Sequence, residues 1–351
     1  MLPKRPVDVL RTGIDMEAEN LRRYDLPVAR RLWLYRQGFL SSRDAIYDLS
    51  EETVDAYLSD VQHLRTEGLN EPNTMALNNT ALFQLVVSRT HAELLPTFHA
   101  ILSADQGVTP VPGGDVETFD DLVALVRENP VVVKPLKQAG GTGVALLESD
   151  GQQLQFDGQP VSESELAEIC SSGPDRMVVE YVEQAEYARE IYPGAANTIR
   201  VLTMIHPDTG EPFIAAAVHR FGWSNTGIVD NWSSGGLTAA FDTEDGTIGE
   251  AVASPKGGSV ARMTHHPDTD TPISGATVPE WPQIRERLLD LAEEYRGLWS
   301  YVGWDIVVTD DEGGFALIEG NAFCDVDLLQ VHEPLLADDR VRRFYEHHGV
   351  V

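Results

Sequence analysis

Residues 303–325 read Gly-Trp-Asp-Ile-Val-Val-Thr-Asp-Asp-Glu-Gly-Gly-Phe-Ala-Leu-Ile-Glu-Gly-Asn-Ala-Phe-Cys-Asp, and this stretch is predicted to form a β-hairpin. Two runs rich in strand-forming residues, Val302–Thr309 and Phe315–Gly320, flank a turn made of Asp, Glu and Gly. Side chains alternate between the two faces of a strand, so the pattern also predicts which residues share a face. The hairpin is therefore the first candidate for a functional site.

The predicted register brings acidic and amide side chains together. If Asp310 pairs with Gly314 across the turn, Asp305 lies opposite Glu319, with side chains about 5 Å apart. Alternation along the second strand adds Asn321 to this face. The same face is expected to carry three apolar side chains: Val307, Phe315 and Leu317. Two carboxylates on a half-apolar face need a compensating cation, and oxygen donors from Asp, Glu and Asn suit Mg²⁺ or Mn²⁺. The alternative is an edge hairpin whose acids face solvent.

The composition of the chain excludes several classes of partner. Among its 351 residues, 56 are acidic and 26 are Lys or Arg, so the formal charge is -30. A field of this sign repels nucleic acid and anionic membrane surfaces, and we expect neither as a partner. The lysines are only Lys4, Lys134, Lys137 and Lys256. An acidic, lysine-poor surface is typical of proteins from a high-salt cytoplasm, so we expect a halophilic protein.

The cysteines and the N-terminal residues bear on location. The two cysteines, Cys170 and Cys324, cannot build a disulfide framework, and neither stands in a zinc-ligand spacing. The N-terminus has no apolar signal core, and no segment approaches the length of a membrane span. We therefore expect a soluble, cytoplasmic protein.

The hydrophobic pattern divides the chain into three regions. Residues 1–105 are expected to be mainly helical, 106–185 to form a small α+β lobe, and 186–351 to form a larger lobe of strands and polar loops with a helical tail. The predicted helices are Val28–Gln37, Glu51–Thr66, Thr74–Ser88, Thr118–Glu128, a short one near Glu163–Cys170, and Gln283–Leu298. The main predicted strands before the hairpin are Val131–Pro135, Val144–Leu147, Met177–Val182, Thr198–Ile205, Phe213–Phe221 and Leu237–Phe241.

A lysine and a glycine-rich loop form the second candidate site. Lys134 stands on an apolar strand, where a buried lysine needs an anionic partner. The loop that follows contains Gly140, Gly141, Thr142 and Gly143, with Lys137 at its entrance. Glycines let backbone N–H groups approach an anion closely, so we interpret the loop as a flap over phosphates. The alternative is a plain turn.

Further candidates stand at the ends of predicted strands. Glu180, Tyr181 and Val182 end an apolar strand between the two lobes, where exposed backbone groups could bind an adenine edge. Arg200 follows Asn-Thr-Ile, Arg220 follows a histidine, and Asn231 belongs to a loop dense in hydrogen-bond donors. Arginine can contact phosphate with two parallel hydrogen bonds, although a single arginine is more often part of a surface ion pair.

Taken in order, these motifs resemble the ATP-grasp superfamily. The set is Val-Val-Lys-Pro, the glycine-rich loop, Val-Val-Glu-Tyr-Val, Asn-Thr-Ile-Arg, His-Arg, Asp-Asn-x-x-x-Gly-Gly and Trp-Asp followed by Glu-Gly-Asn. The likeness spans about residues 75–330 and is closest to the sugar-transfer associated ATP-grasp branch, which is related to α-L-glutamate ligases. It implies an ATP-grasp fold in which two α+β lobes clamp ATP, preceded here by the N-terminal helical region.

The resemblance also implies a role for each candidate residue. Lys134 would contact the phosphates and the adenine side, Glu180 to Val182 would form the adenine hinge, and Glu190 would hold the ribose. Arg200, Arg220 and Asn231 would face the γ-phosphate and the acyl group. Asp305, Glu319 and Asn321 would bind Mg²⁺, with Glu319 bridging two ions. Many relatives carry a basic residue inside the loop where this chain has Thr142, and Lys137 is the residue that could replace it.

The resemblance implies an ATP- and Mg²⁺-dependent ligase that joins a small carboxylate to an amine acceptor through an acyl phosphate. A role in polysaccharide or cell-surface metabolism is consistent with this branch. Two alternatives keep the nucleotide: a kinase that phosphorylates a small hydroxyl substrate, and an ATP-binding module without catalysis. The complete Asp-Glu-Asn set favours catalysis, because binding alone can dispense with it.

Overall fold

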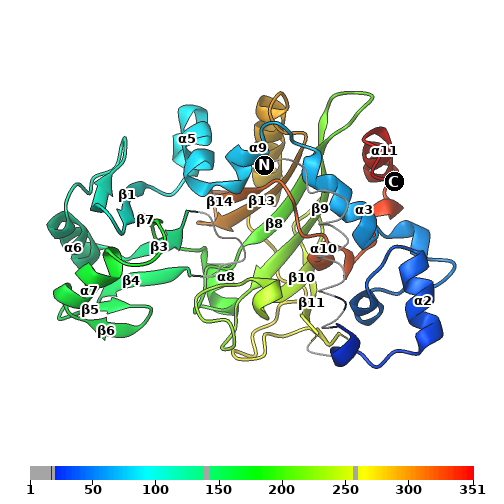
Figure 1. Ribbon diagram of the computed structural model, residues 1–351, viewed down its shortest axis with the longest axis horizontal. Coiled ribbons are helices and arrows are strands. Elements are labelled where there is room, and N and C mark those ends of the chain that lie inside the picture. The colour runs from blue at the N-terminus through cyan, green and yellow to red at the C-terminus, as the bar shows by residue number, and fades with distance from the viewer. Residues whose placement is uncertain (1–16, 18–19, 137–142, 256–259) are drawn as a thin grey trace.

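The computed structural model describes residues 17, 20–136, 143–255 and 260–351 of the chain. Within these residues the strands form two seven-stranded antiparallel sheets, which form the cores of two lobes (Figure 1). Helices pack on both sheets, and the N-terminal region is helical before it enters the smaller sheet. The predicted α+β fold with an N-terminal helical region is confirmed.

The smaller sheet has the strand order β2-β1-β7-β3-β4-β5-β6. Its strands are β1 (Phe98–Ser103), β2 (Gly107–Pro110), β3 (Val131–Pro135), β4 (Ala145–Ser149), β5 (Leu154–Phe156), β6 (Gln159–Val161) and β7 (Arg176–Glu180). Two helices, α6 (Phe119–Glu128) and α7 (Glu163–Cys170), pack their apolar side chains onto it. Each helix begins with a capping box, formed by Thr118 with Asp121 and by Ser162 with Glu165.

The smaller sheet begins earlier in the chain than the predicted boundary at residue 105. Strand β1 pairs with β7, and its Ala100 and Leu102 are buried in the core of the small lobe. From Ala100 to Ser103 buried and half-buried residues alternate, which suits a strand with one face on the core.

The larger sheet has the strand order β12-β11-β10-β9-β8-β13-β14. Its strands are β8 (Ile199–Ile205), β9 (Pro212–Phe221), β10 (Leu237–Phe241), β11 (Ile248–Ala253), β12 (Arg262–Met263), β13 (Tyr301–Val308) and β14 (Phe315–Asn321). The short helix α8 (Glu186–Ile191) connects the two lobes after β7.

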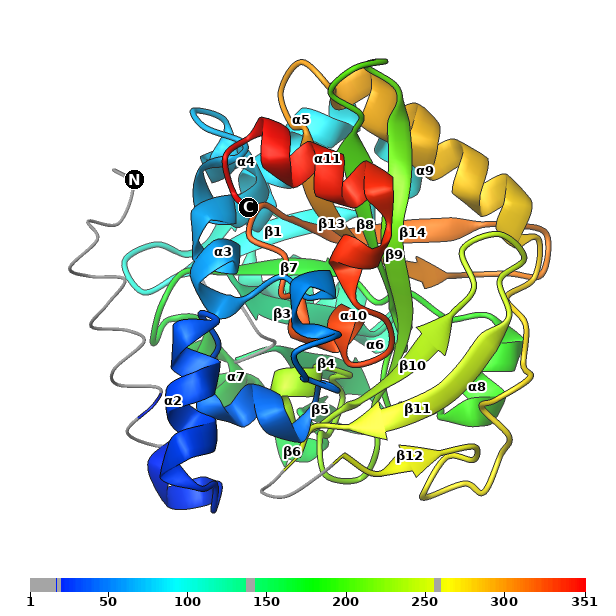
Figure 2. The same ribbon diagram turned by 90° about the vertical axis from the view of Figure 1, so that its right-hand side faces the viewer.

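Helices from both ends of the chain cover the two faces of the larger sheet (Figure 2). One face packs against α9 (Trp281–Tyr295), α4 (Thr74–Asn78) and α5 (Thr80–His91), where Trp281 and Phe83 are fully buried. The other face packs against α10 (Asp327–Gln330) and α11 (Asp339–His347), and α2 (Val28–Arg36) joins the same apolar cluster through Leu34. The N-terminal helices therefore share the two cores of the large lobe.

Polar capping residues break two of the predicted helices. The prediction of one helix over Glu51–Thr66 is wrong, because the segment forms turns and then α3 (Asp60–Arg65), which starts at a capping box on Ser59. The helix predicted over Thr74–Ser88 is interrupted at Asn79, whose side chain accepts a hydrogen bond from the N–H of Leu82. Short 3₁₀ segments complete the helical structure: Ser41–Ala45, Val54–Ala56, Thr66–Gly68, Ala92–Leu94, Trp232–Ser234 and Leu335–Ala337.

The hairpin of β13 and β14 places Asp305 opposite Glu319, as predicted, although the turn differs from the assumed one. The N–H of Thr309 donates to the carbonyl of Gly314 (3.0 Å), so the register near the turn is shifted by one residue. A β-bulge at Ile318 restores the pairing of the two acids. The bulge also changes which residues share a face.

Two apolar side chains of the hairpin lie on the opposite face from the one predicted. Phe315 and Leu317 are buried with Ile306 in the core beneath α9, whereas Ile318 and Glu319 both face the space between the lobes. The prediction that Phe315 and Leu317 lie beside Glu319 is wrong, because the extra residue of the bulge reverses the alternation.

Among the described residues, no helix combines the length and the apolar character that crossing a membrane requires.

Candidate functional site

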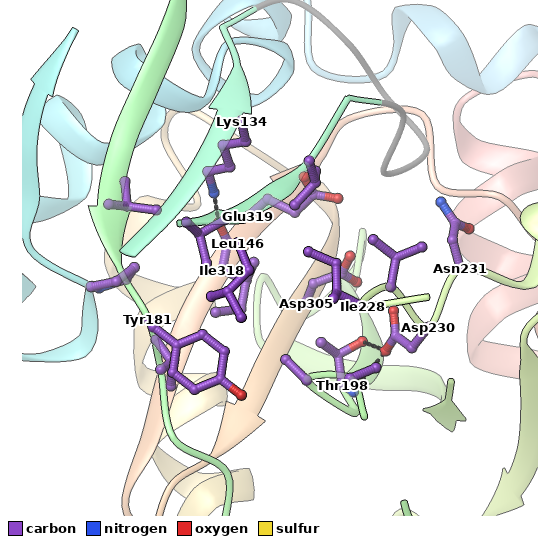
Figure 3. Close-up of a pocket in the computed structure, with 18 of the residues that line it drawn as sticks. Lys134, Leu146, Tyr181, Thr198, Ile228, Asp230, Asn231, Asp305, Ile318 and Glu319 are labelled. Carbon is purple, nitrogen blue, oxygen red and sulfur yellow. Dashed lines mark hydrogen bonds between the residues drawn. The ribbon is translucent and has the colours of Figure 1, made fainter. Parts of the chain in front are cut away.

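A cleft lies between the two sheets and collects many of the candidate residues (Figure 3). Strands β3, β4 and β7 line it from the small lobe, and β13, β14 and the loop after β9 line it from the large lobe. The candidates in its lining are Lys134, Glu180, Tyr181, Val182, Arg220, Asn231, Asp305 and Glu319. Gly143, Glu190, Arg200 and Asn321 are outside the lining, and Lys137, Gly140, Gly141 and Thr142 are outside the described residues.

One part of the cleft is apolar. Leu146 of the small sheet and Ile318 of the large lobe lie next to each other there (Figure 3). Val132 and Ile228 add apolar surface to the same cleft. Tyr181 closes this part at the connection between the lobes. An apolar slot with few polar groups suits a flat aromatic ring such as a nucleobase.

The connection between the lobes leaves backbone groups available at Tyr181. Val131 pairs with Glu180 at the end of the β3–β7 ladder, so the next position sets Tyr181 opposite Pro130. Proline has no N–H, so β3 offers no donor to the Tyr181 carbonyl. The Glu180 carboxylate is used locally, since it accepts hydrogen bonds from the N–H (2.9 Å) and hydroxyl (2.8 Å) of Thr97.

Lys134 reaches from the small lobe to the large lobe. Its ammonium group lies 3.4 Å from the carbonyl oxygen of Ile318, the bulged residue of β14. Burial lowers the pKa of Lys134, while the carboxylates of Glu319 and Asp305 act in the opposite direction. A phosphate group would add a further anionic partner to this half-buried cation.

Asp305 is buried and held by two arginines. Both of its oxygens accept hydrogen bonds from Arg200, through Nε to Oδ1 and through Nη2 to Oδ2 at 2.9 Å. Arg220 adds a third contact, from Nη2 to Oδ2 at 3.1 Å. Burial alone would raise the pKa of Asp305, but the two guanidinium groups hold it well below the usual range. Asp305 is therefore ionised and fixed in orientation.

Glu319 is the acid of the cleft whose charge is least compensated. Its pKa is raised by burial and by the nearby charge of Asp305, although Lys134 and Arg200 oppose this shift. Asn321 lies next to it, with its amide nitrogen 3.4 Å from a Glu319 oxygen and donating to the carbonyl of Gly303 at 3.2 Å. Because the nitrogen is directed to these acceptors, the amide oxygen of Asn321 is left to coordinate a ligand.

These donors fit a hard divalent cation. Among the residues that the structure describes, no group of three or more His, Cys, Asp or Glu side chains is placed to hold a metal, so the candidate set consists of two acids and one amide. A cation beside Glu319 would offset the repulsion that raises its pKa. The arginines around Asp305 correspond to the hydrogen bonds that usually orient a ligating carboxylate.

Arg200 lies behind Asp305, outside the cleft. Its side chain is buried on β8, and its remaining amine, Nη1, is 3.7 Å from the sulfur of Cys324. Strand β8 pairs with β13 and sets Arg200 directly beside Asp305. Its geometry favours a role in orienting Asp305 over direct contact with a bound anion.

A second network surrounds Arg220, and it contains two residues of the quoted motifs, Thr198 and Asp230, to which the sequence analysis assigned no role. Thr198 accepts hydrogen bonds from Arg220 and donates one to Asp230, and both Thr198 and Asp230 line the cleft. The sequence did not predict their contact, because they meet only when the loop after β9 folds back onto the start of β8. Asn231 follows Asp230 and also lines the cleft.

A family model for sugar-transfer associated ATP-grasp proteins matches residues 67–342 of the chain. This chain belongs to the sugar-transfer associated ATP-grasp family. The match covers both sheets, the cleft and the metal-site candidates, and it begins at the segment that leads into α4. A search of curated proteins finds no significant match.

Solved structures of other ATP-grasp enzymes resemble the fold at low identity. A D-alanine–D-alanine ligase from Bacillus anthracis is 12% identical, with 96% of this chain and 93% of that chain covered and a TM-score of 0.40. The biotin carboxylase of Campylobacter jejuni is 11% identical, with coverages of 78% and 47% and a TM-score of 0.42. An N5-carboxyaminoimidazole ribonucleotide synthetase is 10% identical, with coverages of 72% and 46% and a TM-score of 0.39. At these scores the likenesses carry no argument about function, and this chain spans about half of the synthetase.

Two candidates of the ATP-grasp resemblance, Glu190 and Gly143, are described by the structure but do not line the cleft. Glu190 is exposed on α8, and its backbone carbonyl accepts a hydrogen bond from the hydroxyl of Thr271 (3.0 Å). Gly143 has a positive φ of 77°, which glycine adopts without strain, and it leads into β4 beside the cleft-lining Val144. A ribose contact by Glu190 and a phosphate contact by Gly143 therefore stay predictions.

Proposed function

We propose that this ATP-grasp protein is an ATP- and Mg²⁺-dependent ligase that joins a small carboxylate to an amine through an acyl phosphate. The observation that carries the proposal is the meeting, in one cleft, of Lys134 from the small lobe with Asp305 and Glu319 from the large lobe. The ammonium group of Lys134 can bind the phosphates of a nucleotide from one lobe. The two acids of the other lobe can bind the Mg²⁺ ion that those phosphates coordinate.

The nucleotide would lie along the cleft from its apolar part to its charged part. The base would occupy the slot between Leu146 and Ile318, next to the carbonyl of Tyr181, to which β3 offers no donor. Lys134 and Arg220 would contact phosphate oxygens, and Asp305, Glu319 and Asn321 would hold Mg²⁺. The bound ion would offset the charge of the phosphates.

The chemistry would proceed in two balanced steps. An oxygen of the substrate carboxylate attacks the γ-phosphorus, a new P–O bond forms, and the bond to the leaving ADP oxygen breaks. The amine then attacks the carbonyl carbon of the acyl phosphate, inorganic phosphate leaves with its electron pair, and the nitrogen loses a proton. Positioning and electrostatic stabilisation by Arg220 and Lys134 would supply most of the acceleration.

The proposal is tested by a screen of carboxylates, each combined with a mixture of amines, for release of ADP from Mg·ATP. A ligase releases ADP only when its acid is present, and formation of the amide requires the amine as well. Lys134→Met should raise the KM for ATP by about tenfold or more, since a charge-assisted contact to phosphate is lost.

Arg127→Met is the matched control for the lysine variant. Arg127 lies in the same lobe and forms an ion pair with Glu163 in which both side chains are more than half exposed, at 60% and 56%. It carries the same charge but lies outside the cleft lining. Its removal should leave the KM unchanged. Equal effects of both variants, or no acid that stimulates ADP release from the wild-type protein, would count against the proposal.

A further inference from the structure

The hydroxyl of Thr198 lies at the centre of a buried network in the cleft. It accepts hydrogen bonds from Nε (2.9 Å) and Nη2 (2.5 Å) of Arg220. It donates to Oδ2 of Asp230 at 2.6 Å (Figure 3). The backbone N–H of Thr198 donates to the same oxygen at 2.8 Å. A hydroxyl has one donor and two acceptor sites, so all of its capacity is used.

This network has only one possible polarity. An arginine only donates hydrogen bonds and an ionised aspartate only accepts them, so the Thr198 hydroxyl must accept from Arg220 and donate to Asp230. All three residues are buried, with exposed fractions of 5% for Thr198 and Arg220 and 6% for Asp230. The orientation of the Arg220 guanidinium is therefore fixed by its neighbours.

Arg220 is shared between two acids on different elements. Its Nη2 lies 3.1 Å from Asp305 on β13 and 3.3 Å from Asp230 in the loop after β9. Asp305 is already bound by Arg200, whereas Asp230 has no second arginine among its contacts within the described residues. The contact between Asp230 and Arg220 therefore stays in place even when Asp305 binds Arg200 or a metal ion.

The loop that carries Asp230 is held in a fixed shape. The N–H of Gly236 donates to the carbonyl of Asn231 (2.9 Å), and a Cβ at Gly236 would collide with the backbone oxygen of Asp230. Gly235 has a φ of 104°, which favours glycine. The backbone at Asp230 is thus set by close packing, and its side chain is directed onto Thr198.

We propose that Thr198 and Asp230 are positioning residues that hold the Arg220 guanidinium towards the terminal phosphate of the bound nucleotide. This inference rests on the proposed function, because it assumes that a nucleoside triphosphate occupies the cleft. It assigns the discrimination between triphosphate and diphosphate to a Thr–Asp pair that does not itself touch the phosphate.

The test compares the affinities for Mg·AMP-PNP and Mg·ADP, measured by calorimetry. Thr198→Val keeps the shape of the side chain and removes the hydroxyl, and Asp230→Asn removes the charge. Each should weaken AMP-PNP binding by about tenfold, as expected for one hydrogen bond to a charged group, and leave ADP binding within about twofold. Thr198→Ser keeps the hydroxyl and should restore the wild-type preference for the triphosphate.

Asp268→Asn is the control for a general loosening of the loop. Ser224 belongs to the same loop as Asp230, and its N–H (2.6 Å) and hydroxyl (3.1 Å) donate hydrogen bonds to Asp268. Both Ser224 and Asp268 lie outside the cleft lining. This variant should keep both affinities. The inference is overturned if Thr198→Val and Asp230→Asn weaken AMP-PNP and ADP equally, or if neither changes the preference. A wild-type protein that binds no nucleotide would overturn the proposed function together with it.

Discussion

At the scale of single residues, Glu319 carries the charge that the cleft compensates least. Its pKa is raised by burial and by Asp305, so the ionised form is disfavoured in the folded protein without a cation. Glu319→Gln keeps the shape and removes this charge. ATP turnover should fall by roughly 100-fold or more, while the melting temperature without nucleotide should stay equal or rise.

Turnover and thermal melting of Glu319→Gln are compared with those of Glu312→Gln. Glu312 is exposed in the turn of the same hairpin and should tolerate the change in both measurements. Wild-type turnover in Glu319→Gln would mean that the hairpin acids have no part in the reaction.

His219 provides a pH dependence of stability. It is fully buried on β9, accepts a hydrogen bond from the Tyr187 hydroxyl (2.9 Å), and donates from Nδ1 to the carbonyl of Arg220 (3.1 Å). Burial lowers its pKa to about 3, against the ordinary histidine value of 6.5. The unfolded chain therefore binds a proton first on acidification, and stability is lost as the pH falls below 6.5.

His219→Gln should remove this dependence. Between pH 7 and about pH 4.5, its free energy of unfolding relative to wild type should rise by roughly 2 to 3 kcal/mol, which corresponds to two pH units of linkage. Urea unfolding at both pH values measures the difference, and His265→Gln, at an exposed position, is the control. A relative stability that does not change with pH would show that His219 binds a proton equally in the folded and unfolded states, and it would contradict the lowered pKa.

Sequence patterns predicted the chemistry of the site better than its geometry. Lys134, Asp305 and Glu319 could be selected because each is a charged residue in an apolar strand context. The place of Arg200 could not be predicted, because it depends on β8 being the neighbour of β13. Pairings between distant strands are set by the whole fold, and the same holds for the meeting of Thr198 with Asp230.

At the scale of elements, the hairpin of β13 and β14 has the predicted pairing of Asp305 with Glu319, although its turn differs from the predicted one. The bulge at Ile318 compensates for the shifted turn, so Asp305 faces Glu319 in both the expected and the observed registers. Bulges leave little trace in an alternating sequence, which explains why Phe315 and Leu317 were placed on the wrong face. The broken helix at Asn79 has a visible signal, since Asn is a preferred capping residue.

Close packing of α4 and α5 on β14 depends on the glycine between Glu319 and Asn321. A Cβ at Gly320 would lie 2.7 Å from Leu77 and 2.9 Å from Phe83, two buried residues of these helices. Gly320→Ala should therefore lower the free energy of unfolding by about 1 to 3 kcal/mol, as overpacking usually does.

Chemical denaturation measures the effect of Gly320→Ala, with Gly297→Ala as the matched control. A Cβ at Gly297 meets no atom within 4 Å, and its φ is outside the range that side chains avoid. The control should be close to neutral. Equal stability of the two variants would contradict the packing of the helices on this strand.

At the scale of the whole molecule, the excess of acidic residues predicts dependence on salt. With 56 acidic and 26 basic residues, the folded chain repels itself when counter-ions are scarce. The midpoint of thermal unfolding should rise by about 5 °C or more between low and multimolar KCl. Sucrose at equal osmolality is the control for solvent exclusion. An equal or higher midpoint at low salt would end the halophilic interpretation.

The central claim is that the charged cleft forms an acyl phosphate, and hydroxylamine tests it most directly. Hydroxylamine is a small, strong nucleophile that attacks an acyl phosphate when the native amine is absent. With an acid that stimulates ADP release, and with ATP and Mg²⁺, we predict a hydroxamate together with ADP and inorganic phosphate in equal amounts. ADP release with no hydroxamate at high hydroxylamine, or with a stable phosphorylated alcohol as product, would contradict the account.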